Sequence, residues 1–292
     1  MLGAGGMLGH MAVRTLSQEH SVVGTTRAHP EPKSALARFL PIEDWIGGVD
    51  VRQEHQLLSL MEKVKPDVVL NCVGLVKQKM DALSYQESIE INSLLPHRLA
   101  RLCDVNDVKL IQISTDCVFG CGPGVKSQFT EPDASDLYGK TKFLGEVTYG
   151  SALTLRTSIV GRQLSGEESF FEWVLSQRKR KVKGYQRALY TGLTTMELTR
   201  IISKIISEKT QLVGLWQIAS PAISKYDLID RLNKMLNLGI TLVPDNDFIC
   251  DRRLDGAPFE SHAQIQVSNW ENMLTEFVTD QKNYMNQEID NP

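Results

Sequence analysis

Short apolar runs alternate with segments of helical periodicity through the first half of the 292-residue chain. Four runs rich in β-branched residues are typical of buried strands, and the segments between them carry apolar residues at the spacing of amphipathic helices. Strands separated by helices pair in parallel, with right-handed connections that place helices on both faces of the sheet. The pattern therefore predicts an α/β protein with a doubly wound parallel sheet. The expected strands are residues 21–26, 67–72, 109–114 and 152–157, and the expected helices are residues 8–18, 53–65, 85–105 and 138–149.

The second half of the chain is less regular. Helical segments at 196–207 and 226–236 are set among short, irregular pieces. We expect a smaller C-terminal α/β unit that covers the edge of the sheet where ligands bind in such folds and that binds the substrate. The predicted division is a first domain of residues 1–165, to which residues 188–215 return, and a second domain formed mainly by residues 166–292.

Composition argues against several classes of protein. The net charge of −3 and the pI of about 6.1 do not suggest a nucleic-acid partner, and the one basic cluster, at 178–183, is short. No apolar run reaches the roughly 18 residues of a membrane span, and no secretion signal is visible, so we expect a cytoplasmic protein. Five cysteines and six histidines show no paired metal-ligand spacing. We therefore expect no metal site, and free thiols at Cys72, Cys103, Cys117, Cys121 and Cys250.

A glycine cluster, Gly3-Ala4-Gly5-Gly6-Met7-Leu8-Gly9, precedes the first predicted helix. Glycines at positions 3, 6 and 9 allow a tight turn, close approach of the backbone to a pyrophosphate, and close packing of helix on strand. A glycine cluster alone is weak evidence for a cofactor. The strand–helix–strand pattern around it strengthens the prediction of a dinucleotide site.

The end of the second predicted strand bears on which dinucleotide binds. NAD sites usually carry an acid there for the ribose 2′-hydroxyl. Here the residues are Thr25-Thr26-Arg27, and the first acid is Glu31. Arg27 could pair with a 2′-phosphate, and the two threonines could donate hydrogen bonds to it. The alternative is an arginine in a solvated loop. NADP(H) is favoured over NAD(H).

Tyr138 and Lys142 lie four residues apart and share one face of a predicted helix. A free tyrosine titrates near pH 10, and a neighbouring ammonium is expected to lower that pKa, which would make Tyr138 a usable general acid. Thr115 follows the predicted strand 109–114 and could hydrogen-bond a substrate carbonyl together with Tyr138. Each feature occurs by chance, and a Ser/Thr turn would also explain Ser114-Thr115-Asp116. Together, the glycine cluster, the hydroxyl at the strand end and the Tyr–Lys pair point to a reductase.

These motifs resemble the extended short-chain dehydrogenase/reductase superfamily and, within it, the dTDP-4-dehydrorhamnose reductase family. The resemblance implies a Rossmann-type fold and NADPH-dependent reduction of a nucleotide-activated 4-keto-6-deoxy sugar in cell-surface polysaccharide biosynthesis. It implies a catalytic triad of Thr115, Tyr138 and Lys142, with Lys142 also holding the nicotinamide ribose. The resembling segments, within the first 200 or so residues, are 3–9, 65–74, 114–120, 137–146 and 155–161.

The same resemblance implies the cofactor contacts. Asp50 and Val51 would lie near adenine, and Asn92 matches an asparagine that braces the helix beside the active site. Tyr138 and Lys142 would contact the cofactor as well as the substrate. The remaining implied contacts are Gly3, Gly6, Met7, Leu8, Gly9, Asn71, Cys72, Val73 and Gly74.

Some features depart from the family pattern. Only Met1 and Leu2 precede the glycine cluster, and a first strand that short is expected to hold it poorly. Cys117 stands where the family has tyrosine, which predicts an altered sugar preference. Arg252 and Arg253 could bind the substrate diphosphate or form a local ion pair. The resemblance beyond residue 200 is loose.

Two other functions and the assembly stay open. A sugar-nucleotide epimerase or dehydratase uses the same fold, although Asp116-Cys117 lacks the acidic pair that dehydratases carry. A non-catalytic, NADP-binding regulatory subunit would keep the same motifs. The oligomeric state is also open, with a homodimer as one option.

Overall fold

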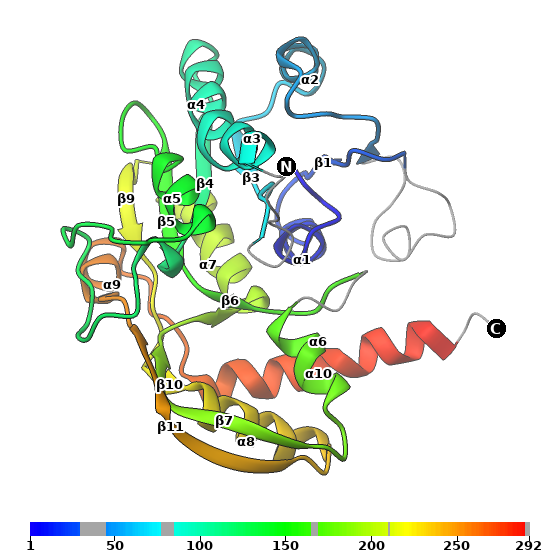
Figure 1. The fold of residues 1–292 in the computed structure, drawn as a ribbon. Coiled ribbons are helices and arrows are strands. Elements are labelled where there is room, and N and C mark those ends of the chain that lie inside the picture. The colour runs from blue at the N-terminus through cyan, green and yellow to red at the C-terminus, as the bar shows by residue number, and fades with distance from the viewer. Residues whose placement is uncertain (30–44, 77–84, 165–168, 210, 290–292) are drawn as a thin grey trace.

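The computed structural model describes residues 1–29, 45–76, 85–164, 169–209 and 211–289. A parallel sheet with helices on both faces carries the N-terminal part of the chain, and a smaller sheet backed by a helix lies beside it (Figure 1). Within these residues, no helix combines the length and apolar character needed to cross a membrane. The α/β fold with a doubly wound parallel sheet, predicted from the sequence, is confirmed.

Among the described residues, six strands and one short bridge form the main sheet, and every pairing found there is parallel. Their order is β2-β1-Leu2-β3-β4-β5-β9, in which Leu2 bridges to Thr25 on one side and to Asn71 on the other. The strands are β1 (Gly24–Thr25), β2 (Trp45–Ile46), β3 (Val68–Asn71), β4 (Lys109–Thr115), β5 (Leu153–Thr157) and β9 (Gly214–Gln217).

The two residues before the glycine cluster are paired on both sides. The Leu2 amide donates to the Leu70 carbonyl at 2.9 Å, and the Leu2 carbonyl accepts from the Cys72 amide at 3.1 Å. On the other edge, the Thr25 amide donates to the Met1 carbonyl at 3.0 Å. The expectation that so short a first strand holds the glycine cluster poorly is therefore wrong, because backbone hydrogen bonds to two neighbours fix it.

The side chains of consecutive strand residues point to opposite faces of the sheet. Leu70 joins a core with helices α1 (Met7–Leu16) and α7 (Thr195–Glu208), whereas Val69 joins a second core with α2 (Glu54–Val64) and α4 (Leu95–Val105). Side chains alternate across a strand, so a strand covered on both faces must be apolar at every position. This is why the strands appeared in the sequence as continuous apolar runs.

The predicted helix at residues 85–105 is divided into three parts. Residues of α3 (Tyr85–Ser88) lead into a π-helical turn, η4 (Ile89–Leu94), before α4 begins. The helix predicted at 138–149 is shorter, α5 (Leu137–Leu144), and begins where the Asp136 carboxylate accepts a 2.9 Å hydrogen bond from the Gly139 amide. Such a cap satisfies an amide that lacks a partner within the helix.

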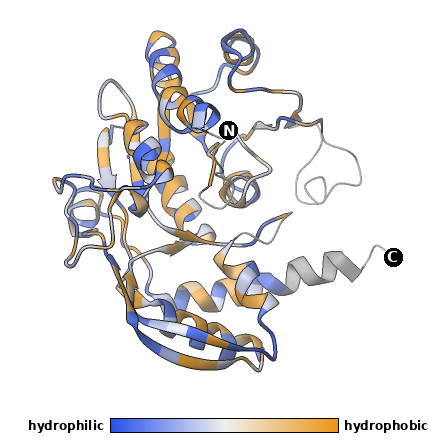
Figure 2. Ribbon diagram, viewed as in Figure 1, coloured by the Kyte–Doolittle hydropathy of each residue, from blue (hydrophilic) through white to orange (hydrophobic). Residues whose placement is uncertain are grey.

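A second sheet has the strand order β10-β7-β11. β7 (Lys181–Tyr190) pairs in parallel with β11 (Thr241–Arg252) and antiparallel with β10 (Ile223–Ser224). Helix α8 (Lys225–Leu236) packs against β7. Figure 2 shows many hydrophilic residues along β7 and β11, which explains why neither strand was predicted.

The remaining elements join the two sheets. β6 and β8 form a short parallel pair, and Phe171 of α6 meets Phe277 of α10 edge to face, with ring centroids 4.4 Å apart. η5 follows β4 directly at the carboxyl edge of the main sheet. These elements are η5 (Asp116–Val118), β6 (Ile159–Val160), α6 (Phe170–Ser176), β8 (Leu193–Thr194), α9 (Ala257–Ala263) and α10 (Trp270–Ile289).

A disulfide corrects one expectation. Cys121, after η5, is bonded to Cys250 on β11, 129 residues away in the sequence, while Cys72, Cys103 and Cys117 are free. The sequence suggested five free thiols because the two partners share no spacing motif. The fold brings them together, since β11 passes beside the segment that follows η5, where the Gly124 amide donates to the Asp251 carboxylate at 2.9 Å.

Candidate active site

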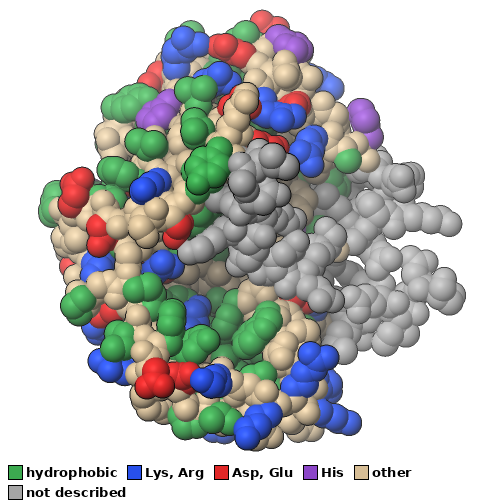
Figure 3. Space-filling view, in the orientation of Figure 1, with side chains coloured by type: hydrophobic (Ala, Val, Ile, Leu, Met, Phe, Trp, Pro, Cys, Tyr) green, Lys and Arg blue, Asp and Glu red, His purple; other side chains and the backbone are tan. Residues whose placement is uncertain are grey.

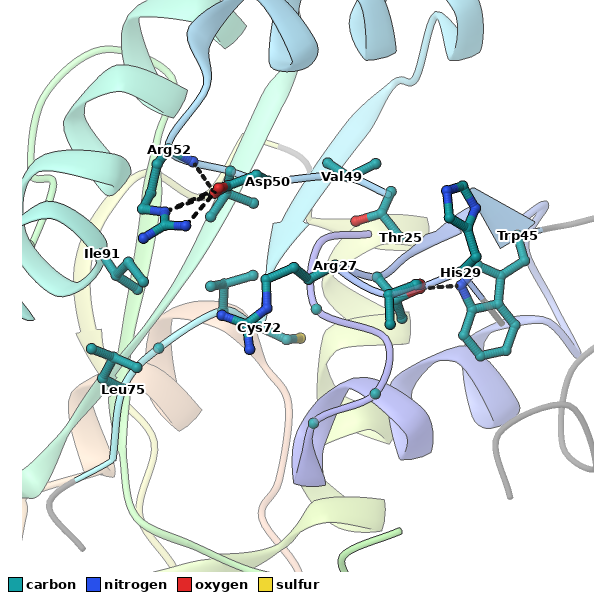
Figure 4. A pocket seen from close by; sticks show the side chains of 18 of the residues that line it. Thr25, Arg27, His29, Trp45, Val49, Asp50, Arg52, Cys72, Leu75 and Ile91 are labelled. Atoms are coloured by element: carbon teal, nitrogen blue, oxygen red, sulfur yellow. Dashed lines mark hydrogen bonds and ion pairs between the residues drawn. The ribbon is translucent and has the colours of Figure 1, made fainter. Parts of the chain in front are cut away.

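A cavity of about 740 Å³ opens at the carboxyl edge of the main sheet. The glycine turn, the end of β1 and the segment after β3 form its walls (Figure 4). Its volume suits a nucleotide-sized ligand. Lining residues include Gly3, Gly5, Gly6, Thr25, Thr26, Arg27, Asp50, Val51, Cys72, Val73, Gly74 and Leu75.

Two positions of the glycine turn, Gly3 and Gly9, require glycine. Gly3 has a φ of +81°, in the left-handed region that side chains other than glycine rarely adopt. A Cβ atom at Gly9 would collide with the carbonyl oxygen of Gly3, so helix α1 can approach the turn only with glycine there. The turn thereby exposes backbone amides at the start of a helix, which suits the binding of a phosphate. The geometry fits a dinucleotide cofactor.

Two arginines, Arg27 after β1 and Arg52 after β2, lie around the carboxylate of Asp50. Arg27 is exposed, and its side chain extends into the cavity from the end of β1 (Figure 4). Arg52 binds Asp50 with its Nε and Nη2 atoms, at 2.9 and 2.7 Å from the carboxylate oxygens. These hydrogen bonds, with a smaller contribution from the charge of Arg27, lower the pKa of Asp50. Arg52 is occupied by Asp50, which leaves Arg27 as the better placed cation for a phosphate.

The two threonines before Arg27 differ from expectation. The Thr26 hydroxyl donates to the Ala28 carbonyl at 2.7 Å and accepts from the Trp45 indole nitrogen at 2.9 Å. Thr25 is buried, with 3% of its surface exposed. Thr26 therefore fixes the turn after β1, and its hydroxyl is not free to donate to a 2′-phosphate as the sequence suggested.

Most of the expected cofactor residues line the cavity, but six do not. Leu8 packs in the core with α7, and Gly9 packs against the glycine turn. The Asn71 side chain donates to Gln112 at 2.7 Å and accepts from the Val73 amide at 3.1 Å, so it orders the cavity wall from behind. The expected residues outside the lining are Met7, Leu8, Gly9, Asn71, Tyr138 and Lys142, and lining residues that were not predicted are Gly5, Ala28, His29, Trp45, Val49, Arg52, Leu75, Ile91 and Leu164.

Asn92, in the π-helical turn, braces both walls of the site. Its side chain accepts from the Leu75 amide at 2.9 Å and donates to the Leu75 carbonyl at 3.1 Å and to the Thr141 hydroxyl at 3.3 Å. The neighbouring Ser93 hydroxyl donates to the Thr141 carbonyl at 2.9 Å. The turn thus ties the cavity wall to α5, in keeping with the tendency of π-helical turns to occur at functional sites.

The three expected catalytic side chains meet at the carboxyl end of β4. The Thr115 hydroxyl accepts from the Cys117 amide at 3.1 Å, and Tyr138 and Lys142 lie one turn apart on α5. Burial raises the pKa of Tyr138 well above its usual value, although a hydrogen bond with the Thr115 side chain partly opposes the rise. The phenol is therefore held in its protonated form.

Lys142 is held by a backbone carbonyl of β4. Its ammonium donates to the Ile113 carbonyl at 2.6 Å, and burial lowers its pKa to about 8 while Glu146 and Cys72 oppose the decrease. The sequence suggested that Lys142 lowers the pKa of Tyr138, but here burial outweighs such an effect. Tyr138 is consequently a proton donor rather than a base in this state.

Arg252 and Arg253 have separate roles. Arg253 forms the local ion pair with Asp251, at 2.7 Å, whereas Arg252 Nη1 donates to the Cys117 sulfur at 3.0 Å. Arg252 therefore reaches the catalytic edge, and Arg253 does not. In the part of the chain that the structure describes, no cluster of three His, Cys, Asp or Glu side chains is placed to hold a metal ion.

Outside the grey residues, the face of the molecule in Figure 3 carries no large patch of one sign. Acidic and basic side chains are mixed over most of this face, and basic side chains gather at its lower edge, beside the second sheet. Residues 178–180 lead into β7, which begins at Lys181, and Lys183 pairs with Asp245 at 3.0 Å. The basic cluster is thus away from the catalytic side chains.

Comparison with curated proteins finds two relatives. A probable low-salt glycan biosynthesis reductase of Haloferax volcanii is 30% identical over 183 residues, 60% of this chain and 58% of that protein. A dTDP-4-dehydrorhamnose reductase of Mycolicibacterium smegmatis is 26% identical over 175 residues, 57% of this chain and 46% of that protein. The chain therefore spans about half the length of these relatives.

Solved structures share the fold. A dTDP-4-dehydrorhamnose reductase from Bacillus anthracis in complex with NADP superposes with a TM-score of 0.73 at 18% identity, covering 96% of this chain and 97% of that one. A family model described as the RmlD substrate binding domain matches residues 1–240. That match covers most of the chain, which therefore belongs to the RmlD substrate binding domain family, as its resemblance to dTDP-4-dehydrorhamnose reductases indicated.

Proposed function

We propose that the protein is an NADPH-dependent reductase of a nucleotide-activated 4-keto-6-deoxy sugar. One observation carries the proposal: Thr115, Tyr138 and Lys142 converge at the end of β4, beside a cavity built on a glycine turn. A proton donor next to a dinucleotide-sized cavity suits reduction of a carbonyl.

Each catalytic side chain has a separate task. The Thr115 hydroxyl and the Tyr138 phenol hydrogen-bond the substrate carbonyl oxygen, and Tyr138 donates its proton as that oxygen becomes an alkoxide. Lys142 remains largely protonated at neutral pH and places positive charge beside the forming alkoxide and the cofactor ribose. NADPH, when bound, supplies the hydride.

Arg27 supports NADPH as the cofactor. It is the exposed cation at the end of β1, where NAD sites usually carry an acid, and its neighbour Arg52 is held by Asp50. The Bacillus anthracis relative was solved in complex with NADP, which agrees with this choice. Of the implied contacts, Gly3, Gly6, Asp50, Val51 and the segment 72–74 would hold the cofactor from the cavity wall.

The substrate class follows from the relatives' names. One is a dTDP-4-dehydrorhamnose reductase and another a probable glycan biosynthesis reductase, so we infer a nucleotide sugar as substrate and cell-surface polysaccharide biosynthesis in the cytoplasm as the setting. We also infer that residues 1–165 and 188–215 form the cofactor-binding unit, and that most of residues 166–292 bind the sugar nucleotide.

The test measures cofactor binding and turnover separately. Titration with NADPH and NADH should show tighter binding of NADPH, and oxidation of NADPH should follow addition of a dTDP-4-keto-6-deoxy sugar. Tyr138→Phe should lower kcat by about 10²–10⁴-fold, the usual contribution of a general acid, and should change the Kd for NADPH far less. Near-normal turnover by this variant would contradict the proposed role of Tyr138.

The outcome of the titration also distinguishes the other functions. NADPH binding without oxidation of any keto sugar would favour a regulatory subunit. A tightly held cofactor that is reduced and reoxidised within one turnover would favour an epimerase or dehydratase.

A further inference from the structure

His10 is a buried histidine that holds the glycine turn of the cavity in place. Its Nδ1 atom lies 2.9 Å from the carbonyl oxygen of Gly6, one helical turn earlier. A carbonyl oxygen only accepts hydrogen bonds, so Nδ1 carries a proton and donates it. The backbone amide of His10 donates to the same oxygen at 3.0 Å. One residue thus fixes the carbonyl of Gly6, which lines the cavity, with both its backbone and its side chain.

Segments from distant parts of the sequence meet around this imidazole. The charges of Arg14, Arg162 and Asp280 all act on the ring. Arg14 lies one turn further along α1, and its guanidinium donates two hydrogen bonds to the Asp280 carboxylate of α10. Arg162 follows β6 and pairs with Glu172 of α6 at 2.6 Å. His10 is therefore the residue through which the glycine turn meets α10.

The charges in this group balance without a charge on the imidazole. Arg14 pairs with Asp280, and Arg162 has its own carboxylate partner, so a protonated ring would add a third cation to two ion pairs. Burial lowers the pKa of His10, the hydrogen bond to Gly6 opposes the decrease, and the two arginines add to it. The ring is therefore neutral, and its one proton is donated to the glycine turn.

Helix α10 follows the second sheet in the sequence, yet its buried face supports α1. Met273, Leu274 and Phe277 of α10 belong to the same apolar core as Leu8 of α1. Asp280 lies one turn beyond Phe277 and is only 5% exposed. Docking of α10 thus brings a buried carboxylate to the helix that begins at the glycine turn.

We propose that His10 is a positioning residue that couples docking of α10 to the binding of NADPH at the glycine turn. The inference rests on the proposed function, because it takes NADPH as the cofactor. The Gly6 carbonyl and the Met7 amide belong to one planar trans peptide and point in opposite directions. Holding the carbonyl toward His10 therefore holds the Met7 amide toward the start of the helix, where a phosphate binds.

Two substitutions of His10 test the role of Nδ1. Asparagine can place its amide nitrogen near the position of Nδ1 and donate to the same carbonyl, whereas leucine has a similar volume and no donor. In a calorimetric titration with NADPH, His10→Asn should keep the Kd within threefold of the wild-type value. His10→Leu should raise the Kd at least fivefold, the effect of one lost buried hydrogen bond. A purely structural role would not favour asparagine over the apolar residue.

Asp280→Asn tests the coupling from the far end of the group. It removes the charge that Arg14 pairs with and should raise the Kd at least threefold. Asp230→Asn is the matched control, because Asp230 pairs with Lys234 on α8, and its Kd should stay within twofold. Since Asp280 acts through His10, the double variant His10→Leu/Asp280→Asn should bind NADPH no more weakly than His10→Leu alone.

Hydrogen exchange measures the same coupling in the other direction. Coupling between two sites is reciprocal, so NADPH should slow exchange of the α10 amides at least twofold in the wild type and in Asp230→Asn. It should not do so in His10→Leu. This comparison also holds if the variant is less stable, because each protein is compared with itself, with and without NADPH.

Three results would overturn the inference alone: wild-type affinity in His10→Leu, fully additive effects in the double variant, or no effect of NADPH on exchange in α10. A wild-type protein that does not bind NADPH would instead overturn the proposed cofactor, and this inference with it. The two failures are therefore distinguished by the first titration.

Discussion

Glu146 is a buried carboxylate that holds three groups of the catalytic edge in place. It accepts from Arg156 Nε at 2.9 Å and Nη2 at 2.5 Å, and from the Ser114 hydroxyl at 2.6 Å. The Arg156 and Glu146 side chains are only 2% and 4% exposed. Glu146 also lies one turn beyond Lys142 and helps to keep that ammonium charged. It therefore joins the ends of β4 and β5 beneath the site.

Glu146→Gln should lower the free energy of unfolding by about 3 kcal/mol, because it leaves the Arg156 guanidinium buried without a counter-charge. Urea denaturation measures the change. Glu54→Gln is the control: Glu54 pairs with Arg101 on the surface, where the side chains are 55% and 72% exposed, and its loss should stay below about 1 kcal/mol. Equal effects of the two substitutions would contradict a special role for the buried pair.

At the scale of elements, the pattern of apolar residues predicted the strands that helices cover on both faces of the sheet. β3, β4 and β5 fall inside the predicted ranges or within one residue of them, because strands covered by helices on two sides are apolar throughout. β1 retains only Gly24–Thr25 of the predicted 21–26. Its outer neighbour β2 is only two residues long, so little of the predicted run is held by pairing.

The elements that could not be predicted from the sequence are those whose geometry depends on contacts with residues far away in the chain. β7 has the sequence KVKGYQRALY and is mostly exposed, so no alternation of apolar residues marks it as a strand. The π-helical turn η4 has the same apolar spacing as the α-helices on either side of it. What distinguishes it is the hydrogen bond that the Asn92 side chain accepts from the Leu75 amide. Neither feature is a local property of the residues involved.

The same distinction holds for the residues of the candidate site: those in local sequence patterns were predicted, and those placed by pairing of distant strands were not. Thr115, Tyr138 and Lys142 were predicted because a strand end and an i, i+4 pair are local patterns. Lys225 and Tyr190 were missed, since they reach the site through strand pairing in a different sheet. Arg252 was noticed in the sequence, but its contact with Cys117 spans 135 residues and has no local signal.

At the scale of the whole molecule, one covalent bond joins the catalytic edge to the second sheet. Cys121 follows η5, and Cys250 lies two residues before Arg252 on β11. Around this bond, the Lys126 amide donates to the Arg253 carbonyl at 2.7 Å and the Asp255 amide to the Lys126 carbonyl at 2.9 Å. The bond and these hydrogen bonds hold Arg252 against the segment that carries Thr115.

The disulfide is expected to stabilise the molecule by restricting the unfolded chain. For a closed loop of this size, with partners 129 residues apart, chain entropy gives an upper value of roughly 5 kcal/mol, and measured effects are typically 2–4 kcal/mol. The double variant Cys121→Ser/Cys250→Ser should therefore melt several degrees lower than the oxidised protein. Reductant should lower the melting temperature of the wild type toward that of the variant and leave the variant unchanged.

Thiol titration of the denatured protein tests the bond itself. Without reductant the chain should show three reactive thiols, those of Cys72, Cys103 and Cys117, and with reductant it should show five. Five thiols in the unreduced protein would contradict the disulfide.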